Sequence, residues 1–272
     1  MEARKMRLEV AQLHITAQMK GGTFSTVVQN ICLSVETGKR LAIVGQSGSG
    51  KTMTAMAILG LLPENCSALG HVVWNGIDIL SLNARQRRSY LGTDFALIPQ
   101  SGADFLNPSL KVGTQFREVL RRARIERSLQ GTLMHRLLSG TGFDDPAQIL
   151  RSYPFQLSGG MAQRVVMAMA AAGNPHLVIA DEPTRGIDQE NIRVFLANLN
   201  TLFKDSAILL ITHDISVAAA CDEILVMNDG HVIESAPARI LLQHPKAKYT
   251  RRLICNLPTA YTSKKEALIN DA

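Results

Sequence analysis

The chain is poor in cysteine, with four in 272 residues and none in a C-x-x-C pair. None lies near a histidine at ligand spacing, so the sequence indicates no zinc site. Disulfides are not expected in the reducing compartment that the rest of the sequence indicates. We therefore predict ordinary core or surface thiols at Cys32, Cys66, Cys221 and Cys255.

Long apolar runs are also missing. No uninterrupted run reaches the roughly 18–20 residues of a transmembrane helix, because polar residues and a proline break the most apolar stretch, residues 161–180. The first five residues are followed by no apolar signal region. Hydrophobic residues make up 46% of the chain, enough for a real core. We expect a soluble protein that is made and kept inside the cell.

No aromatic residues alternate with the basic ones, although the formal net charge is +6 and arginines cluster within residues 85–88 and 121–127. A nucleic-acid patch and attraction to an anionic membrane surface are both open interpretations. The second cluster, however, falls in an expected helix that also carries Glu118 and Glu126. We favour a solvated helix face and expect no nucleic-acid partner.

The hydrophobic pattern predicts an α/β fold. Residues 7–35 alternate apolar and polar, which favours short antiparallel strands. Buried strands then alternate with helices, which implies a mainly parallel sheet covered on both faces. Residues 101–158 are helical and basic, as in an insertion. We divide the chain into a first part of the core (1–100), a helical subdomain (101–158), a second part of the core (159–245) and a polar tail (246–272) that is partly disordered at its end.

Residues 45–52 fit the pattern G-x-x-x-x-G-K-[ST] at every fixed position, after a buried strand and before a helix-like stretch. This context distinguishes a phosphate-binding loop from a plain glycine turn. The glycines let backbone N–H groups turn inward around an anion, and the helix N-terminus adds partial positive charge. Lys51 would reach the β- and γ-phosphates, and Thr52 would bind Mg²⁺. The loop consists of Gly45, Gln46, Ser47, Gly48, Ser49, Gly50, Lys51 and Thr52.

Two further motifs point to nucleotide chemistry. The apolar strand 177–180 ends in Asp181, which suits Mg²⁺, and Glu182, which could polarise an attacking water. A helix-capping acid is the alternative, but the phosphate loop favours the catalytic interpretation. Ser158 precedes Gly159 and Gly160 at the start of an expected helix, where it could act as the cap. A nucleotide held between two subunits would explain a second anion-binding helix end.

Together these motifs resemble the ATP-binding subunit of an ATP-binding cassette (ABC) transporter, over about residues 7–258. The resemblance implies a P-loop NTPase core with Walker A at 45–52, Walker B at 177–181 and the signature motif at 157–161. It also implies an N-terminal antiparallel β region and a helical subdomain.

The resemblance assigns roles to single residues as well. Glu182 matches the catalytic glutamate, His213 the switch histidine, and Gln100 the glutamine that follows the third core strand. Thr52, Gln100 and Asp181 would hold Mg²⁺, and residues 186–188 match the aspartate loop.

A narrower resemblance is to importers of oligopeptides, dipeptides and nickel. It rests on the segments 106–110, 112–115, 153–156, 244–245, 249–250 and 257–258, and on Glu118. The short C-terminal part favours the nickel or metal-chelate members. Some long members carry a cysteine-rich cluster there, whereas this chain has only Cys255, so we predict no iron–sulfur site.

The resemblance implies an ATPase, with ATP and Mg²⁺, at the cytoplasmic face of the inner membrane as a peripheral subunit. Two such chains, copies or paralogues, would close on two ATP molecules, with Ser158, Gly159 and Gly160 reaching the partner's nucleotide. Two transmembrane permease subunits and an extracytoplasmic solute-binding protein would complete the importer, and the ATPase would not contact the cargo. Cassettes of DNA repair or translation are one alternative, but they usually have long coiled coils or a second cassette, and the sequence indicates neither. A metabolic P-loop kinase is another alternative, but it would not need the motif at residues 157–160.

Three features depart from the family pattern. Residues 16–22 lack the usual adenine-stacking aromatic, which leaves Phe24 as the nearest candidate or as a core residue. Arg185-Gly186 replaces the common Thr-Ala or Ser-Ala, and Gly186 would loosen the loop that couples two sites. Met161 replaces a common glutamine.

The helical subdomain is also expected to dock on the membrane subunits. Its exposed-looking apolar residues are Phe105, Leu106 and Leu110, unless these simply pack the subdomain.

Overall fold

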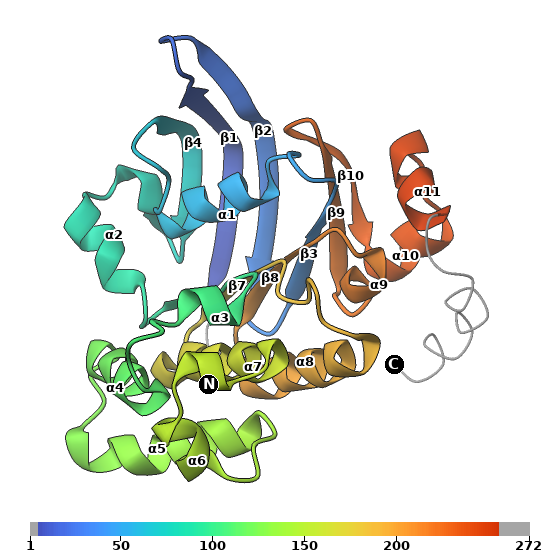
Figure 1. Ribbon diagram of the computed structural model, residues 1–272. Coiled ribbons are helices and arrows are strands. Elements are labelled where there is room, and N and C mark those ends of the chain that lie inside the picture. The colour runs from blue at the N-terminus through green and yellow to red at the C-terminus, as the bar shows by residue number, and fades with distance from the viewer. Residues whose placement is uncertain (1–4, 256–272) are drawn as a thin grey trace.

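A six-stranded sheet forms the centre of the molecule, in a computed structural model that describes residues 5–255 (Figure 1). Its order is β10-β9-β3-β8-β7-β6, and all pairs are parallel except the β9–β10 hairpin. The predicted α/β class with a mainly parallel sheet is confirmed. The strands are β3 (Arg40–Val44), β6 (Phe95–Ile98), β7 (Leu177–Asp181), β8 (Ala207–Thr212), β9 (Glu223–Asn228) and β10 (His231–Pro237).

A second, antiparallel sheet with the order β2-β1-β4-β5 packs against it through a shared core. The strands are β1 (Arg7–Gln18), β2 (Phe24–Glu36), β4 (Cys66–Trp74) and β5 (Ile77–Asp78). The prediction of short strands over 7–35 was wrong, because β1 and β2 have 12 and 13 residues. Gln12 and Asn30 adopt positive φ angles of 49° and 52°, and the β1–β2 register shifts nearby. Such bulges interrupt the alternation of apolar and polar residues along a long strand, so that its sequence resembles that of several short strands.

Helices lie on both faces of the six-stranded sheet, and others form a group beside it. The described helices are α1 (Lys51–Leu59), α2 (Ala84–Tyr90), α3 (Gly102–Phe105), α4 (Val112–Arg122), α5 (Arg127–Gly140), α6 (Pro146–Arg151), α7 (Gly159–Ala170), α8 (Gln189–Leu202), α9 (Ile215–Ala218), α10 (Ala238–Gln243) and α11 (Lys248–Cys255). Ile58 of α1 shares one core cluster with Leu8 of β1 and Ile43 of β3, so α1 lies in the core that joins the two sheets. Phe195 of α8 and Leu241 of α10 pack into the core on the other face.

The predicted helical region at 101–158 holds α3 to α6, which gather with α7 on one side of the molecule (Figure 1). Phe116 and Leu138 pack there with Val165 of α7, so this hydrophobic cluster continues into α7. One prediction for the region was wrong, because Leu106 is only 4% exposed and belongs to the cluster, whereas Phe105 is 59% exposed. The four-residue helix α3 ends between these two neighbours and turns them in different directions.

The polar tail predicted from Lys246 begins instead with a helix, α11. Its residues Tyr249, Leu253 and Ile254 pack against the core of the six-stranded sheet. The expected disordered end and the pair Leu257-Pro258 lie outside the described residues. Within residues 5–255, no helix is both long enough and apolar enough to cross a membrane.

Candidate functional site

The turn from β3 into α1 is shaped by its glycines. A Cβ on Gly45 would lie 2.2 Å from the carbonyl oxygen of Met227, so only glycine allows the loop to sit this close to β9. Gly48 and Gly50 adopt left-handed φ angles of 83° and 94°, which glycine reaches without steric cost. Gly50 ends the loop at the N-terminus of α1 and provides no side-chain cap. The first N–H groups of α1 are therefore available to an anion, as the sequence predicted.

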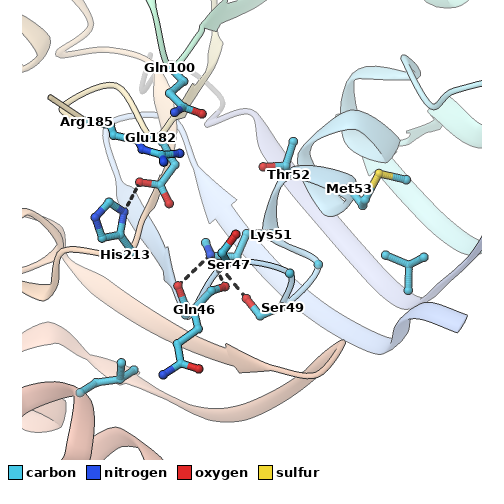
Figure 2. Close-up of a pocket in the computed structure, with 15 residues that line it drawn as sticks. Gln46, Ser47, Ser49, Lys51, Thr52, Met53, Gln100, Glu182, Arg185 and His213 are labelled. Atoms are coloured by element: carbon cyan, nitrogen blue, oxygen red, sulfur yellow. Dashed lines mark hydrogen bonds and ion pairs between the residues drawn. The ribbon is translucent and has the colours of Figure 1, made fainter.

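Lys51 is the buried cation of this loop, with only 6% of its surface exposed. Its Nζ donates to the carbonyl oxygens of Gly45 at 2.7 Å and Gln46 at 2.8 Å (Figure 2). Burial lowers the pKa of Lys51, while Glu182 and Asp181 act to raise it. The ammonium is thus held over the loop by neutral acceptors.

Thr52 and Asp181 meet beside this lysine. Thr52 Oγ1 donates to Asp181 Oδ1 at 3.2 Å, although the two residues are far apart in the sequence. Burial raises the pKa of Asp181, which stands at the C-terminal end of β7. A hydroxyl, a carboxylate and the amide of Gln100, which lines the same cavity, provide oxygen ligands, the chemistry that Mg²⁺ prefers. The residues present therefore fit the predicted Mg²⁺ site.

Glu182 and His213 form a pair at the ends of adjacent strands. His213 Nδ1 and Glu182 Oε2 lie 2.5 Å apart, so a protonated Nδ1 donates to the carboxylate (Figure 2). Glu182 holds a left-handed φ of 48°, and its N–H donates to the carbonyl of Ile211 at 2.8 Å. Such a backbone conformation is costly for a residue with a side chain, and it persists where the surroundings enforce it. Here it points the carboxylate at the histidine after β8.

One cavity of about 520 Å³ unites most of the predicted site. It is lined by Val27, Gly45, Gln46, Ser47, Gly48, Ser49, Gly50, Lys51, Thr52, Met53, Gln100, Glu182, Arg185, His213 and Leu253. Figure 2 shows Gln100, Glu182, Arg185 and His213 grouped on the side opposite Thr52. Gln100 is also linked to the helical region, because Gln163 of α7 donates to the carbonyl of the preceding Pro99 at 3.0 Å.

Sequence reasoning missed four lining residues, namely Val27, Met53, Arg185 and Leu253. Val27 lies within the predicted antiparallel region and Met53 directly after the loop, and neither belongs to a motif. Leu253 lies in the segment expected to be a tail. Arg185 was noted only as a departure from the family pattern. Phe24 is 70% exposed and does not line the cavity, so its interpretation as a core residue was wrong.

The residues of the predicted signature motif lie apart from the cavity. Ser158 caps α7, as expected, by accepting a hydrogen bond from the N–H of Met161 at 3.2 Å. Neither Ser158, Gly159 nor Gly160 lines the cavity, so this chain alone does not bring the two anion-binding helix ends together.

The predicted aspartate loop leads from the cavity into α8. Asp188 caps α8 by accepting from the N–H groups of Glu190 and Asn191, and these and the Asn191 side chain lower its pKa. Gly186 has a left-handed φ of 74° and open space around it. The loop therefore depends on glycine for its backbone angle rather than for close packing.

The family model for ABC transporters matches residues 28–185, more than half of the chain. The chain belongs to the ABC transporter family. The match spans the phosphate loop, the segment with Gln100, the signature motif and the pair Asp181 and Glu182. ATP binding and hydrolysis, the activity predicted from the sequence, follow from this membership.

Relatives at similar identity cover most of this ABC cassette. The metal-staphylopine import system ATP-binding protein CntD of Staphylococcus aureus is 35% identical, over 85% of this chain and 87% of the relative. The oligopeptide transport ATP-binding protein OppD of Bacillus subtilis is 35% identical, over 96% of this chain and 74% of the relative. The dipeptide transport ATP-binding protein DppD of Haemophilus influenzae is 38% identical, over 92% of this chain and 77% of the relative. The predicted resemblance to peptide and metal-chelate importers is confirmed.

Solved structures agree with the fold of an ABC cassette. A dimeric structure of MJ0796, a bacterial ABC transporter cassette, has a TM-score of 0.74 at 25% identity and covers 85% of this chain and 98% of that one. The same cassette in a post-hydrolysis state, bound to ADP and Pi, has a TM-score of 0.75 at 24% identity and covers the same shares of the two chains. These likenesses confirm the predicted P-loop NTPase architecture.

Proposed function

We propose that this chain is the ATP-hydrolysing subunit of an importer, and that it energises uptake of a small solute through two separate permease subunits. The proposal rests on one observation above all. Lys51, the Thr52–Asp181 pair and the Glu182–His213 pair meet in or beside a single cavity of an ABC-family chain. The chain would act at the cytoplasmic face of the membrane as a peripheral subunit.

The motif residues in and beside the cavity have specific roles in this proposal. Lys51 and the N–H groups of the phosphate loop bind the β- and γ-phosphates. Glu182 accepts the proton of the attacking water, and His213 orients the Glu182 carboxylate through their hydrogen bond. Mg²⁺, held by Thr52, Asp181 and Gln100, would supply charge neutralisation at the phosphates.

The second half of the site comes from another copy or a paralogue. Ser158 and the two glycines after it start a helix whose first N–H groups lie outside their own chain's cavity. Two chains facing each other would therefore each complete the other's nucleotide site. Binding would close the pair, hydrolysis would reopen it, and the permeases would convert this motion into alternating access.

The cargo class is a peptide or a metal chelate, as in the import systems for which the relatives are named. An extracytoplasmic solute-binding protein would deliver it to the permeases. The cavity is assigned to nucleotide, and in this proposal the cargo passes through the permeases without contacting this chain.

Lys51→Ala tests the function directly. We expect this variant to lose most of its ATP affinity and all turnover, because no neighbouring side chain replaces the charge at the phosphates. Equilibrium binding and phosphate release measure both, and a host carrying only the variant should fail to take up labelled dipeptide or nickel chelate. Wild-type binding and turnover in the variant would refute the assignment, and tight, salt-dependent binding of duplex DNA by the wild type would favour a nucleic-acid cassette instead.

A further inference from the structure

The C-terminal helix α11 reaches the start of the phosphate loop. The backbone N–H of Gln46 donates to the hydroxyl of Tyr249 at 3.2 Å. Leu253, one helical turn later on the same face, lines the nucleotide cavity. Two residues of α11 thus approach a loop that lies two hundred positions earlier in the sequence.

The peptide group between Gly45 and Gln46 is held at both ends. Its carbonyl oxygen accepts from Lys51 Nζ at 2.7 Å, and its N–H donates to Tyr249. A peptide group is planar, so fixing the N–H also fixes the direction of the carbonyl. Tyr249 therefore acts on the phosphate-binding lysine through a single rigid unit.

α11 itself is anchored to the sheet, so the tyrosine is a fixed partner. The carboxylate of Glu234 on β10 accepts from the N–H groups of Lys246 and Ala247, at 2.9 and 3.0 Å, just before the helix begins. Tyr249 and Leu253 then pack on the core of the six-stranded sheet. Figure 1 shows α11 on the β9–β10 side of this sheet.

We propose that Tyr249 is a positioning residue for ATP binding, which orients the Gly45–Gln46 peptide and thereby Lys51. The inference rests on the proposed ATP-binding function of this cavity. A loop that is already in its binding shape binds more tightly, because the competent fraction of the free protein sets the apparent affinity. The hydroxyl acts equally on the bound substrate and on the transition state.

Tyr249→Phe removes the hydroxyl and keeps the ring. One hydrogen bond of this kind is worth about a two- to tenfold change in an equilibrium constant. We expect the Kd and KM for ATP to rise by about that factor, with kcat unchanged. Inorganic triphosphate, measured by competition, should lose affinity by the same factor, since the effect acts at the phosphate end.

Tyr90→Phe is the matched control. Tyr90 is half-buried and stacks on the core residue Phe95, and it does not line the cavity, so its variant should bind ATP as the wild type does. If the Tyr249→Phe variant binds ATP like the wild type, the proposal is overturned, even if the melting temperature falls. The role of Tyr249 would then be only to pack its ring against the core. An effect on ATP but not on triphosphate, or failure of the variant to fold, would also overturn it. If the wild type itself binds no ATP, the proposed function fails instead.

Discussion

Replacing Glu182 with glutamine separates ATP binding from ATP hydrolysis. Glutamine is nearly isosteric, and its amide oxygen can still accept the hydrogen bond that His213 Nδ1 makes over 2.5 Å. The left-handed backbone at position 182 is set by its surroundings and not by the carboxylate, because the N–H bond to Ile211 remains. The substitution therefore removes one chemical property, the ability to take a proton.

The size of the effect follows from that single loss. A positioned general base contributes about 10²- to 10⁴-fold to a rate, so kcat should fall by that factor. The Kd for ATP should not rise, since the change removes one negative charge from the wall that faces the phosphates. With hydrolysis blocked, an ATP-dependent dimer should accumulate. Phosphate release, equilibrium ATP binding and size-exclusion chromatography with Mg-ATP measure the three quantities.

Unchanged turnover in Glu182→Gln would refute this assignment. The base would then have to be another group in the cavity, and His213 is the next candidate because it lines the same wall. His213→Ala is the companion variant. If Glu182 is the base, His213→Ala should slow turnover without raising the Kd, since it loses only the orientation of the carboxylate.

Two further predictions concern the surface and the C-terminal helix. Phe105→Glu should change stability by less than about 0.5 kcal/mol and leave ATP binding intact, yet prevent assembly with the permeases, because the side chain is exposed. Leu106→Glu should instead destabilise the chain by several kcal/mol, since it places a charge in the core. If Phe105→Glu still assembles with the permeases in pull-downs, Phe105 is not part of the docking surface. The pKa of Glu234 is lowered in the fold, because hydrogen bonds to Lys246 and Ala247 outweigh partial burial, which acts to raise it. The ionised carboxylate therefore stabilises the fold fully at pH values above the ordinary glutamate pKa, and this stabilisation is lost as the pH falls through the lowered pKa of the folded state. The melting temperature should thus drop more steeply with acid in the wild type than in Glu234→Gln. Equal dependence of the two melting temperatures on pH would contradict this prediction.

The sequence was sufficient wherever function depends on local geometry. The phosphate loop could be predicted because its glycines, Lys51 and Thr52 are consecutive, and strand and helix flank them. Gln100 and His213 could be assigned through the family resemblance, which places them directly after core strands, and residues that follow parallel strands meet at one edge of the sheet.

Contacts between distant segments could not be predicted in this way. Tyr249 and Leu253 repeat at helical spacing, which was a signal for α11, but nothing local shows that this helix touches Gln46. Phe105 and Leu106 are neighbours with opposite exposure, and hydrophobicity alone cannot separate them. The bulges at Gln12 and Asn30 likewise depend on which strands pair.

The position of β3 in its sheet has a consequence for how the chain is made. β3 pairs with β8 on one side and β9 on the other, and both follow it by well over half of the chain. The carbonyl of Met227 on β9, against which Gly45 fits, is therefore synthesised long after the phosphate loop. A nascent chain leaving the ribosome carries the complete loop sequence but no wall to shape it. Nucleotide affinity thus arises only when the last third of the cassette has been translated, and ATP can stabilise only chains that are nearly complete.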